Sequence, residues 1–433
     1  MSSPWDELKY GPWPEDAEVP HDRPDAGTRK RLGLPATLRP VPGAVQRAVF
    51  DPALKHHAKA LRAGEPAFES AEISERWYAA RRQAIDHVLA VIAGSEWVDN
   101  LVLRGSILLR AWYGEAAREP GDLDFVVVPR TWGIAERRTH AMLDGIARQA
   151  EATAPEGLRM DARDAVAEDI WTYDRVPGRR LVLTWQAGGL PHGSVQLDFV
   201  FNELLPADPE PTRVPRFDGG PAPLLMAATP ELSLAWKVMW LLDDAYPQGK
   251  DLYDALLLAA HTSLSYRLLA DAMVASDPHR ARRLPTLDEV AALDVDWEEF
   301  RKEYPEFAPM PGTAEDTVQR LVVALRPTFT REHDLPEGEY ARRAELLGPR
   351  IRRYAILKAE GGLDPVIAMM AKEDGIPVEE AVVIVNELLG RSANAVPHSL
   401  DLVMRGYELA GSSWIGYYRR NPEKREEILT ALR

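Results

Sequence analysis

The chain contains one short segment in which acidic and apolar residues alternate, and this alternation is the strongest restriction that the sequence places on the fold. Asp122 and Asp124 lie two positions apart in a predicted strand, so both side chains project from the same face. The other face carries apolar side chains that can pack on helices: Leu123, Phe125 and Val127. Two carboxylates held this close repel each other, and a divalent cation between them removes that cost. The segment therefore predicts a sheet with one apolar face and a cation site on the other.

A second strand pattern repeats this arrangement around Asp198. Apolar residues occupy alternate positions on one face: Val195, Leu197, Phe199 and Phe201. Asp198 lies on the opposite face, and it completes a cluster of three carboxylates if the two strands are neighbours. Three carboxylates can bind two cations, which neutralise a triphosphate and lower the pKa of an attacking hydroxyl. We therefore expect Asp122, Asp124 and Asp198 to bind Mg²⁺ or Mn²⁺ and to take part in catalysis.

A glycine turn supplies the remaining requirement of phosphate chemistry. A strand predicted over residues 98 to 103 ends at Arg104, Gly105 and Ser106, and a helix follows over residues 107 to 113. Glycine allows phosphate to approach the backbone, and the amino end of the helix offers free N–H groups and a favourable dipole. Ser106 can cap the helix or hydrogen-bond a phosphate oxygen. We therefore assign Gly105 and Ser106 to nucleotide binding.

The order of these features carries more weight than any one of them. A lone Asp-x-Asp pair is commonly a solvated strand edge, and a lone Gly-Ser after a strand is usually a turn. A strand, a Gly-Ser turn, a helix, an Asp-x-Asp strand and a later apolar strand with one Asp form a far more specific series. The series favours an enzyme that moves a nucleoside monophosphate from a metal-bound NTP to an acceptor.

Composition narrows the class of protein without identifying it. The 433 residues include no cysteine, which excludes disulfides, thiolate metal sites and a cysteine nucleophile. The formal net charge of −15 argues against a nonspecific DNA-coating protein, which would need a dominant positive field. No apolar run reaches the length of a membrane span, and the acidic, proline-rich start has no secretory signal pattern. We expect a cytoplasmic protein with no membrane partner.

The pattern of strands and helices predicts an α+β fold, in which a small sheet precedes a long helical region. Residues 1 to 45 are rich in proline and charge and lack periodicity, so we expect an extended, poorly ordered arm. Residues 46 to 220 contain the predicted strands and form the expected nucleotidyltransferase core. Residues 221 to 330 are expected to form a helical domain that completes the active site, and residues 331 to 433 a C-terminal helical extension.

These ordered motifs resemble those of the AbiEii/AbiGii-type toxin family, within the DNA polymerase β-like nucleotidyltransferase superfamily. The resemblance covers roughly residues 85 to 260 and includes the Gly-Ser turn, the Asp-x-Asp strand and the later Asp198. Two further family motifs are a helix with a lysine and a basic-Asp pair that opens another helix, and they match Lys237 and Lys250-Asp251. The resemblance implies a polymerase β-like core, which is a small mixed sheet with flanking helices, followed here by a large C-terminal helical region.

The resemblance also implies roles for residues whose sequence context allows two interpretations. Lys237 lies in an apolar helix, where its ammonium can reach either the surface or the triphosphate, and the family favours the triphosphate. Asp251 then orients Lys237 or the acceptor, so both are expected to be catalytic. Asp254 lies three residues further on the same helix face and can substitute for Asp251. Arg118, in the family pattern that precedes the first acid, is expected to contact the nucleotide phosphates. Apart from the resemblance, Arg180 at the start of the predicted hairpin is expected to contact them through bidentate hydrogen bonds.

One position departs from the family pattern Arg-x-Ser/Thr-x-Asp. The chain has Arg118-Glu119-Pro120-Gly121-Asp122, so Pro120 replaces the hydroxyl residue and removes a side-chain donor. The resemblance still implies NTP-dependent nucleotide transfer, in some members to the 3′ end of tRNA. It also implies a toxin encoded beside a cognate antitoxin, or a role in phage defence.

Three functional hypotheses stay open at this point. The first is a toxin-like nucleotidyltransferase that acts on RNA, with tRNA as the expected acceptor. The second keeps the enzyme class but takes a small molecule or a protein side chain as acceptor, and the long helical C-terminal half argues mildly against it. The third is a catalytically degenerate scaffold that binds nucleotide, for which Pro120 is the one hint.

Overall fold

The computed structural model describes residues 3–8, 13, 16–54, 60–172, 176–245, 247–304, 312–330, 336 and 338–432. Within these residues, eight strands form a main sheet in the order β5-β7-β8-β4-β3-β10-β9, with β6 paired to β7. The strands are β3 (Leu101–Arg104), β4 (Asp122–Val127), β5 (Leu158–Met160), β6 (Val166–Thr172), β7 (Val176–Ala187), β8 (Gly193–Val200), β9 (Glu210–Arg213) and β10 (Leu224–Ala227). The pairs β4–β8 and β3–β10 are parallel, and the other pairs are antiparallel. The predicted mixed sheet within an α+β fold is confirmed.

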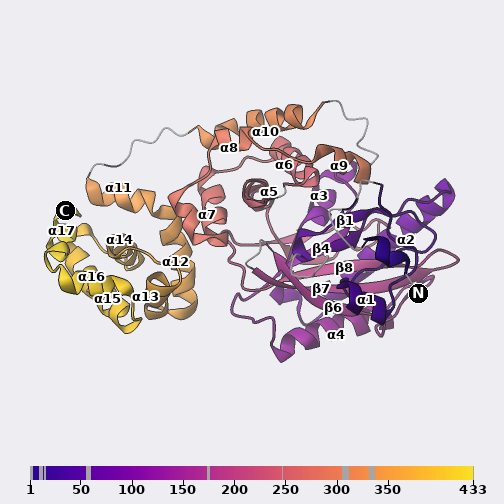
Figure 1. Ribbon diagram of the computed structural model, residues 1–433, viewed down its shortest axis with the longest axis horizontal. Coiled ribbons are helices and arrows are strands. Elements are labelled where there is room, and N and C mark those ends of the chain that lie inside the picture. Colours follow the sequence, from indigo (N-terminus) through magenta and orange to yellow (C-terminus); the bar gives the residue numbers. More distant parts are fainter. Residues whose placement is uncertain are drawn as a thin grey trace.

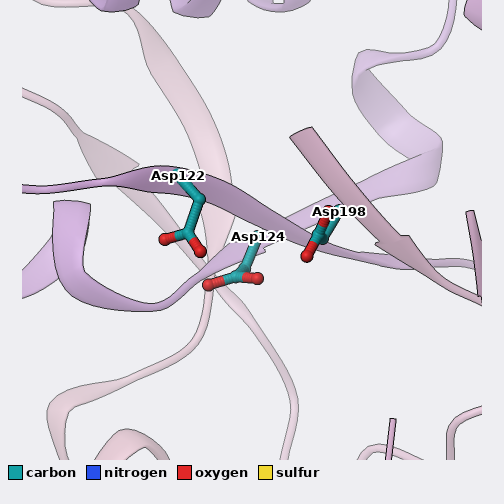
Figure 2. A group of neighbouring side chains, drawn as sticks. All are labelled: Asp122, Asp124 and Asp198. Carbon is teal, nitrogen blue, oxygen red and sulfur yellow. The ribbon is translucent and has the colours of Figure 1, made fainter. Parts of the chain in front are cut away.

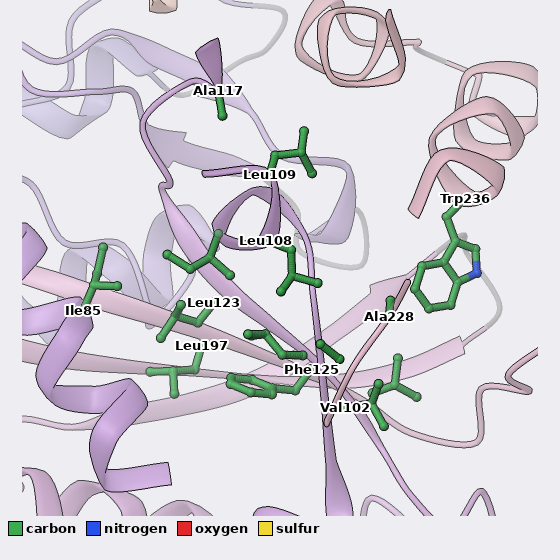
Figure 3. Packing of buried hydrophobic residues seen from close by; sticks show 14 of the residues in the cluster. Ile85, Val102, Leu108, Leu109, Ala117, Leu123, Phe125, Leu197, Ala228 and Trp236 are labelled. Atoms are coloured by element: carbon green, nitrogen blue, oxygen red, sulfur yellow. The ribbon is translucent and has the colours of Figure 1, made fainter. Parts of the chain in front are cut away.

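The apolar face of the sheet is covered by helices from the first half of the chain. These helices are α2 (Ala71–Ala93), α3 (Ser106–Tyr113) and α4 (Arg137–Ala152). Leu123, Phe125 and Leu197 are fully buried in one hydrophobic core with Ile85 of α2 and Leu108 of α3 (Figure 3). Each such side chain contributes about 1.5–3 kcal/mol when it is removed from water. A shift of one residue in strand pairing would expose this whole set, so the burial also fixes which face carries the acids.

The helices that follow the sheet share the same hydrophobic core. They are α5 (Pro230–Asp243), α6 (Gly249–His261), α7 (Tyr266–Ser276), α8 (Leu287–Ala291), α9 (Trp297–Glu303) and α10 (Ala314–Phe329). Helix α5 begins at Pro230, and the side chain of Thr229 caps it by accepting a hydrogen bond from the Leu232 N–H at 3.1 Å. Helix α5 packs against α6, and α6 against α10. Figure 1 shows α5 and α6 next to each other on the side of the sheet that faces the later helices.

The C-terminal helices build a second hydrophobic core of their own. They are α11 (Glu339–Leu346), α12 (Gly348–Gly361), α13 (Leu363–Lys372), α14 (Val378–Leu388), α15 (Val396–Leu409), α16 (Ser413–Arg420) and α17 (Glu423–Ala431). Helix α12 packs against α7, and Arg352 of α12 pairs with Asp271 of α7. A second ion pair joins Arg130, beyond the end of β4, to Glu360 at 2.8 Å. Figure 1 shows these helices gathered to one side of the sheet.

The expectation of an extended, poorly ordered arm over residues 1 to 45 differs from the structure. Among the described residues of this range, α1 (Ala26–Leu32) begins after Asp25, whose side chain accepts from the Thr28 N–H, and ends at Gly33 in the left-handed conformation. A small hydrophobic core joins this range to the strand β2 (Leu61–Ala63): Trp5, Leu8, Val19, Leu32, Leu34, Leu38 and Leu61. These apolar residues are spaced without helical or strand periodicity, so the sequence pattern gave no sign of their common burial.

Residues 16–54 and 60–70, called the N-terminal segment below, lie across one side of the sheet. Strand β1 (Ala48–Phe50) pairs with β2, and the segment is tied to α9 by the ion pairs Arg47–Glu299 and Arg62–Glu303. At its other end, the buried Glu168 of β6 accepts hydrogen bonds from the N–H groups of Ala36 and Thr37 and from the Thr37 hydroxyl. The segment thus spans the distance between the β6–β7 end of the sheet and the helices after it.

The strand expected over residues 98 to 103 begins later, at Leu101, because residues 98–100 form a short 3₁₀ helix. The hairpin predicted around residues 187 to 193 is confirmed as the antiparallel pair β7–β8. Among the described residues, none of the helices has both the length and the apolar character that a membrane crossing needs.

The contacts of Glu168 lead to a prediction about the N-terminal segment. Glu168→Gln replaces one acceptor oxygen by an NH₂ group that faces other donors, which costs about 1–3 kcal/mol for the buried groups left unsatisfied. We expect the N-terminal segment to be cleaved faster in limited proteolysis, with a lower unfolding temperature. Glu210→Gln, at an exposed glutamate of β9, is the matched control. Equal cleavage rates for both variants and the wild type would contradict the anchoring role.

Candidate active site

The three acids predicted from the sequence meet at the centre of the sheet. In the parallel pair β4–β8, Asp124 stands opposite Asp198 and Asp122 stands opposite Gln196. Each acid offers a carboxylate oxygen, and these oxygens all lie within 4.8 Å of one another. Figure 2 shows the three carboxylates on the same side of the two strands. Asp198 is buried, whereas Asp122 and Asp124 are partly exposed to the cavity beside them.

The acids disturb each other's protonation. Burial and, to a smaller extent, the charges of Asp122 and Asp198 together raise the pKa of Asp124 to about 8. Burial also raises the pKa of Asp198, although Arg180 opposes this effect. A raised carboxyl pKa of this kind indicates that the positive charges nearby do not balance the three acids. The donor set therefore fits divalent cations such as Mg²⁺ and Mn²⁺, which prefer carboxylate oxygen ligands.

Gly105 allows the turn before α3 to pass directly over the acids. Its φ angle of +87° lies in the region that favours glycine, and a Cβ atom there would come within 2.4 Å of the Asp124 carboxylate. Ser106 is the first residue of α3, and the N-cap position before it is Gly105, so Ser106 does not cap the helix. The Ser106 hydroxyl is buried, and it has no hydrogen-bond partner among the described residues. A buried hydroxyl of this kind at a helix amino end suits a phosphate oxygen.

Lys237 is held by two carboxylates rather than one. Its Nζ atom lies 2.7 Å from Asp251 and 2.9 Å from Asp254, both on α6. Although burial alone would lower it, these two acids raise the pKa of Lys237, so the ammonium stays charged. Asp254 also accepts hydrogen bonds from Nε and Nη2 of Arg118, whose Nη1 atom donates to the Tyr304 hydroxyl at 3.0 Å. The acid that the sequence left as a substitute therefore shares the lysine with Asp251.

The two arginines assigned to nucleotide phosphates point at carboxylates in the structure. The guanidinium of Arg118 contacts Asp254, as described above. The guanidinium of Arg180 donates to both oxygens of Asp198 at 2.9 Å and to Asp51 at 2.6 Å. Either arginine could contact a phosphate only if it shared or gave up its hydrogen bonds to these carboxylates. Phosphate binding by Arg118 and Arg180 therefore stays a prediction.

One cavity of about 580 Å³ joins these groups. Every residue that the sequence analysis assigned to the site lines it: Gly105, Ser106, Arg118, Asp122, Asp124, Arg180, Asp198, Lys237 and Asp251. Helices α5 and α6 form one wall of the cavity. The N-terminal segment forms another and contributes Thr37, Asp51, Arg62 and Glu65.

Comparison with known proteins identifies the family. The model of the family described as "Nucleotidyl transferase AbiEii toxin, Type IV TA system" matches residues 87–324, which is more than half of the chain. The chain belongs to this AbiEii family. It is therefore a nucleotidyltransferase and a toxin of a type IV toxin–antitoxin system, and its family implies an NTP substrate and usually a divalent metal.

Solved structures add a resemblance at lower similarity. The chain is similar to MenT4, a nucleotidyltransferase toxin from Mycobacterium tuberculosis H37Rv, with 17% sequence identity and a TM-score of 0.43. That alignment covers 60% of this chain and 87% of MenT4. Comparison with curated proteins gives no significant match.

Sequence reasoning missed several residues of this AbiEii site. Asp51 and Glu65 come from the N-terminal segment, which precedes the residues that the family model matches and has no periodic pattern. Arg104 stands next to the Gly-Ser turn and was given no role. It pairs with Glu203 at 2.8 Å and lies over the ring of Trp236. Arg104 could have been found from the sequence, because it is a charged residue at the end of an apolar strand. No sequence pattern pointed to Asp51.

The raised pKa of Asp124 predicts a pH-dependent cost of folding. Between pH 4 and its folded pKa of about 8, Asp124 keeps a proton in the folded state that the unfolded chain has released. Stability contributed by this group is therefore lost as the pH rises through that window. Asp124→Asn removes the effect, so without divalent metal it should unfold a few degrees above the wild type at pH 9 and closer to it at pH 5.

Metal provides the second half of this test. Mg²⁺ should raise the unfolding temperature of the wild type at pH 9 and leave that of Asp124→Asn unchanged. Asp169→Asn, at an acid of β6 whose side chain is 60% exposed and pairs with Arg179, is the control that should follow the wild type. The explanation fails if the difference between Asp124→Asn and the wild type is the same at both pH values.

Proposed function

We propose that this AbiEii-family toxin transfers a nucleoside monophosphate from an NTP to the 3′ end of tRNA in a metal-dependent reaction. The observation that carries the proposal is the convergence of three carboxylates, within 4.8 Å, beside a glycine turn and a buried hydroxyl without a partner. Carboxylates for cations and donors for phosphate oxygens are the two requirements of nucleotidyl transfer, and they share one cavity here.

The residues divide the work of binding and orientation. Asp122, Asp124 and Asp198 would hold one or two Mg²⁺ or Mn²⁺ ions, which neutralise the triphosphate and lower the pKa of the acceptor hydroxyl when bound. Ser106 and the N–H groups at the start of α3 would bind phosphate oxygens. Asp251 and Asp254 keep Lys237 charged and fix its position in the wall of the cavity, from which it would place its ammonium near the triphosphate.

RNA is the acceptor that the sequence and the cavity favour together. A cavity of about 580 Å³ can enclose one nucleotide-sized ligand, so a large acceptor would insert only its end. A terminal hydroxyl of a tRNA meets this requirement, and transfer to tRNA occurs in some relatives that the motifs resemble. A small molecule or a protein side chain is the alternative acceptor, and a scaffold that binds nucleotide without turnover is the other alternative.

The cellular role follows from the family and from the proposed acceptor. A toxin that blocks tRNA ends would stop translation, and a cognate antitoxin encoded beside it would be its partner. We propose a cytoplasmic site of action because charged NTPs and tRNA are found there. A contribution to phage defence would use the same arrest.

A labelled-substrate experiment tests the reaction and the acceptor together. The protein is incubated with each α-labelled NTP, Mg²⁺ and either total tRNA, cell extract or aminoglycosides, and tRNA is then analysed by mass spectrometry. We expect tRNA to gain the mass of one or more nucleotides with the wild type. Asp124→Ala should reduce transfer by at least about 10³-fold, because the cluster loses a ligand oxygen.

Controls separate the three hypotheses. Asp169→Asn changes an exposed acid of strand β6, which pairs with β7, and should transfer label like the wild type. Label that moves only with a small molecule or with protein would replace tRNA as the acceptor. NTP binding in calorimetry without turnover at any divalent metal would leave the scaffold hypothesis, and undiminished transfer by a folded Asp124→Ala would refute the assignment of the site.

A further inference from the structure

Arg180 bridges a candidate metal ligand and an acid outside the predicted site. Its Nε and Nη2 atoms each donate to one oxygen of Asp198 at 2.9 Å, and its Nη1 atom donates to Asp51 at 2.6 Å. All three side chains are nearly inaccessible to solvent, with exposed fractions of 5% for Arg180 and 9% for each acid. A buried charge needs a partner, so the protonation and position of each group depend on the other two.

Asp51 is rigidly placed by the N-terminal segment. Its second oxygen accepts a hydrogen bond from the Ala53 N–H at 3.0 Å, and its own N–H donates to the carbonyl of Ala60 at 2.8 Å. Leu54 and Ala60 pack against Ile170 of β6, which attaches this turn to the sheet. Burial alone would raise the pKa of Asp51, but the nearby Arg180 keeps this pKa below its usual value, so Asp51 is negatively charged.

A cation that binds the three acids must share Asp198 with Arg180. The positive charge of Arg180 opposes a second positive charge beside it, and its bidentate pair with Asp198 competes for the same oxygens. Asp51 reduces both effects, because it offsets the charge of Arg180 and offers the guanidinium a partner on its other side. Without that charge, Asp198 would have to balance Arg180 and bind metal at the same time.

We propose that Asp51 is a positioning residue of the nucleotidyl transfer site, which acts through Arg180 to free Asp198 for a divalent cation. The inference rests on the proposed metal-dependent function. It assigns part of the active site to the N-terminal segment, which lies outside residues 87–324, the range that the family model matches. Among the described residues, Asp51 makes no hydrogen bond or ion pair with the acids on β4 or with the glycine turn, and Arg180 is the group that joins it to Asp198.

Direct metal binding gives a readout that does not depend on catalysis. Mn²⁺ alone is titrated at pH 7.5 into the full-length protein, and free Mn²⁺ is followed by electron paramagnetic resonance. Asp51→Asn keeps the size of the side chain and its acceptor for Ala53 but removes the charge. We expect it to bind Mn²⁺ about tenfold more weakly than the wild type. In nucleotide transfer, high Mn²⁺ should restore its maximal rate, because the defect lies in metal affinity.

A double-mutant cycle separates positioning from a structural role. Arg180→Gln removes the residue through which Asp51 acts, so adding Asp51→Asn to it should change Mn²⁺ affinity by less than about twofold. Arg180→Lys serves in the same cycle if the glutamine variant does not fold as judged by circular dichroism. The control Glu299→Gln breaks the ion pair of the same segment with α9, away from the acids, and should bind Mn²⁺ like the wild type.

The outcomes distinguish the inference from the function on which it rests. Unchanged Mn²⁺ affinity in Asp51→Asn, with binding abolished in Asp124→Asn, would overturn the role of Asp51 and leave the proposed function standing. An equal loss of affinity on adding Asp51→Asn to the wild type and to Arg180→Gln would also overturn it, because the effect would then not pass through Arg180. A wild type that binds no Mn²⁺ would defeat both.

Discussion

The structure around the site depends on the electrostatic repulsion among three carboxylates that lie, partly shielded from water, on the central strands β4 and β8. Asp122, Asp124 and Asp198 cannot all be ionised there without a positive charge close by, and the raised pKa of Asp124 expresses this conflict. The fold tolerates the conflict because the opposite face of the same strands is fully buried and apolar. Hydrophobic packing on one face thus holds acids together on the other against their own repulsion.

Positive charge near the acids is supplied from several parts of the chain, and each cation is itself tied to a second acid. Arg180 links Asp198 to Asp51, and Arg104 extends from β3 to Glu203. Lys237 is shared by two acids of α6. Such alternation of sign lets charged groups remain buried without an uncompensated charge.

The chemistry of the site was more predictable than its surroundings. Strand periodicity placed Asp122, Asp124 and Asp198 on one face, and the register of β4 with β8 bears this out. The contact of Lys237 with both Asp251 and Asp254 follows from residues three apart on a helix. Asp51 was invisible because its partner Arg180 is 129 residues away, and long-range pairing leaves no local pattern. The burial of Trp5 and Leu34 escaped notice for the same reason.

The range of residues that the family model matches and the range that lines the cavity do not begin at the same place in the chain. Relatedness within the family, as matched by residues 87–324, starts inside helix α2. The cavity wall starts much earlier in the chain, because part of it comes from residues before position 70, which are bound to β6 at one end and to α9 at the other. Relatives that share the central motifs but lack such a wall would present the same acids in an open trough. Variation in the N-terminal segment would therefore change which acceptors reach the three acids, while the acids themselves stay the same.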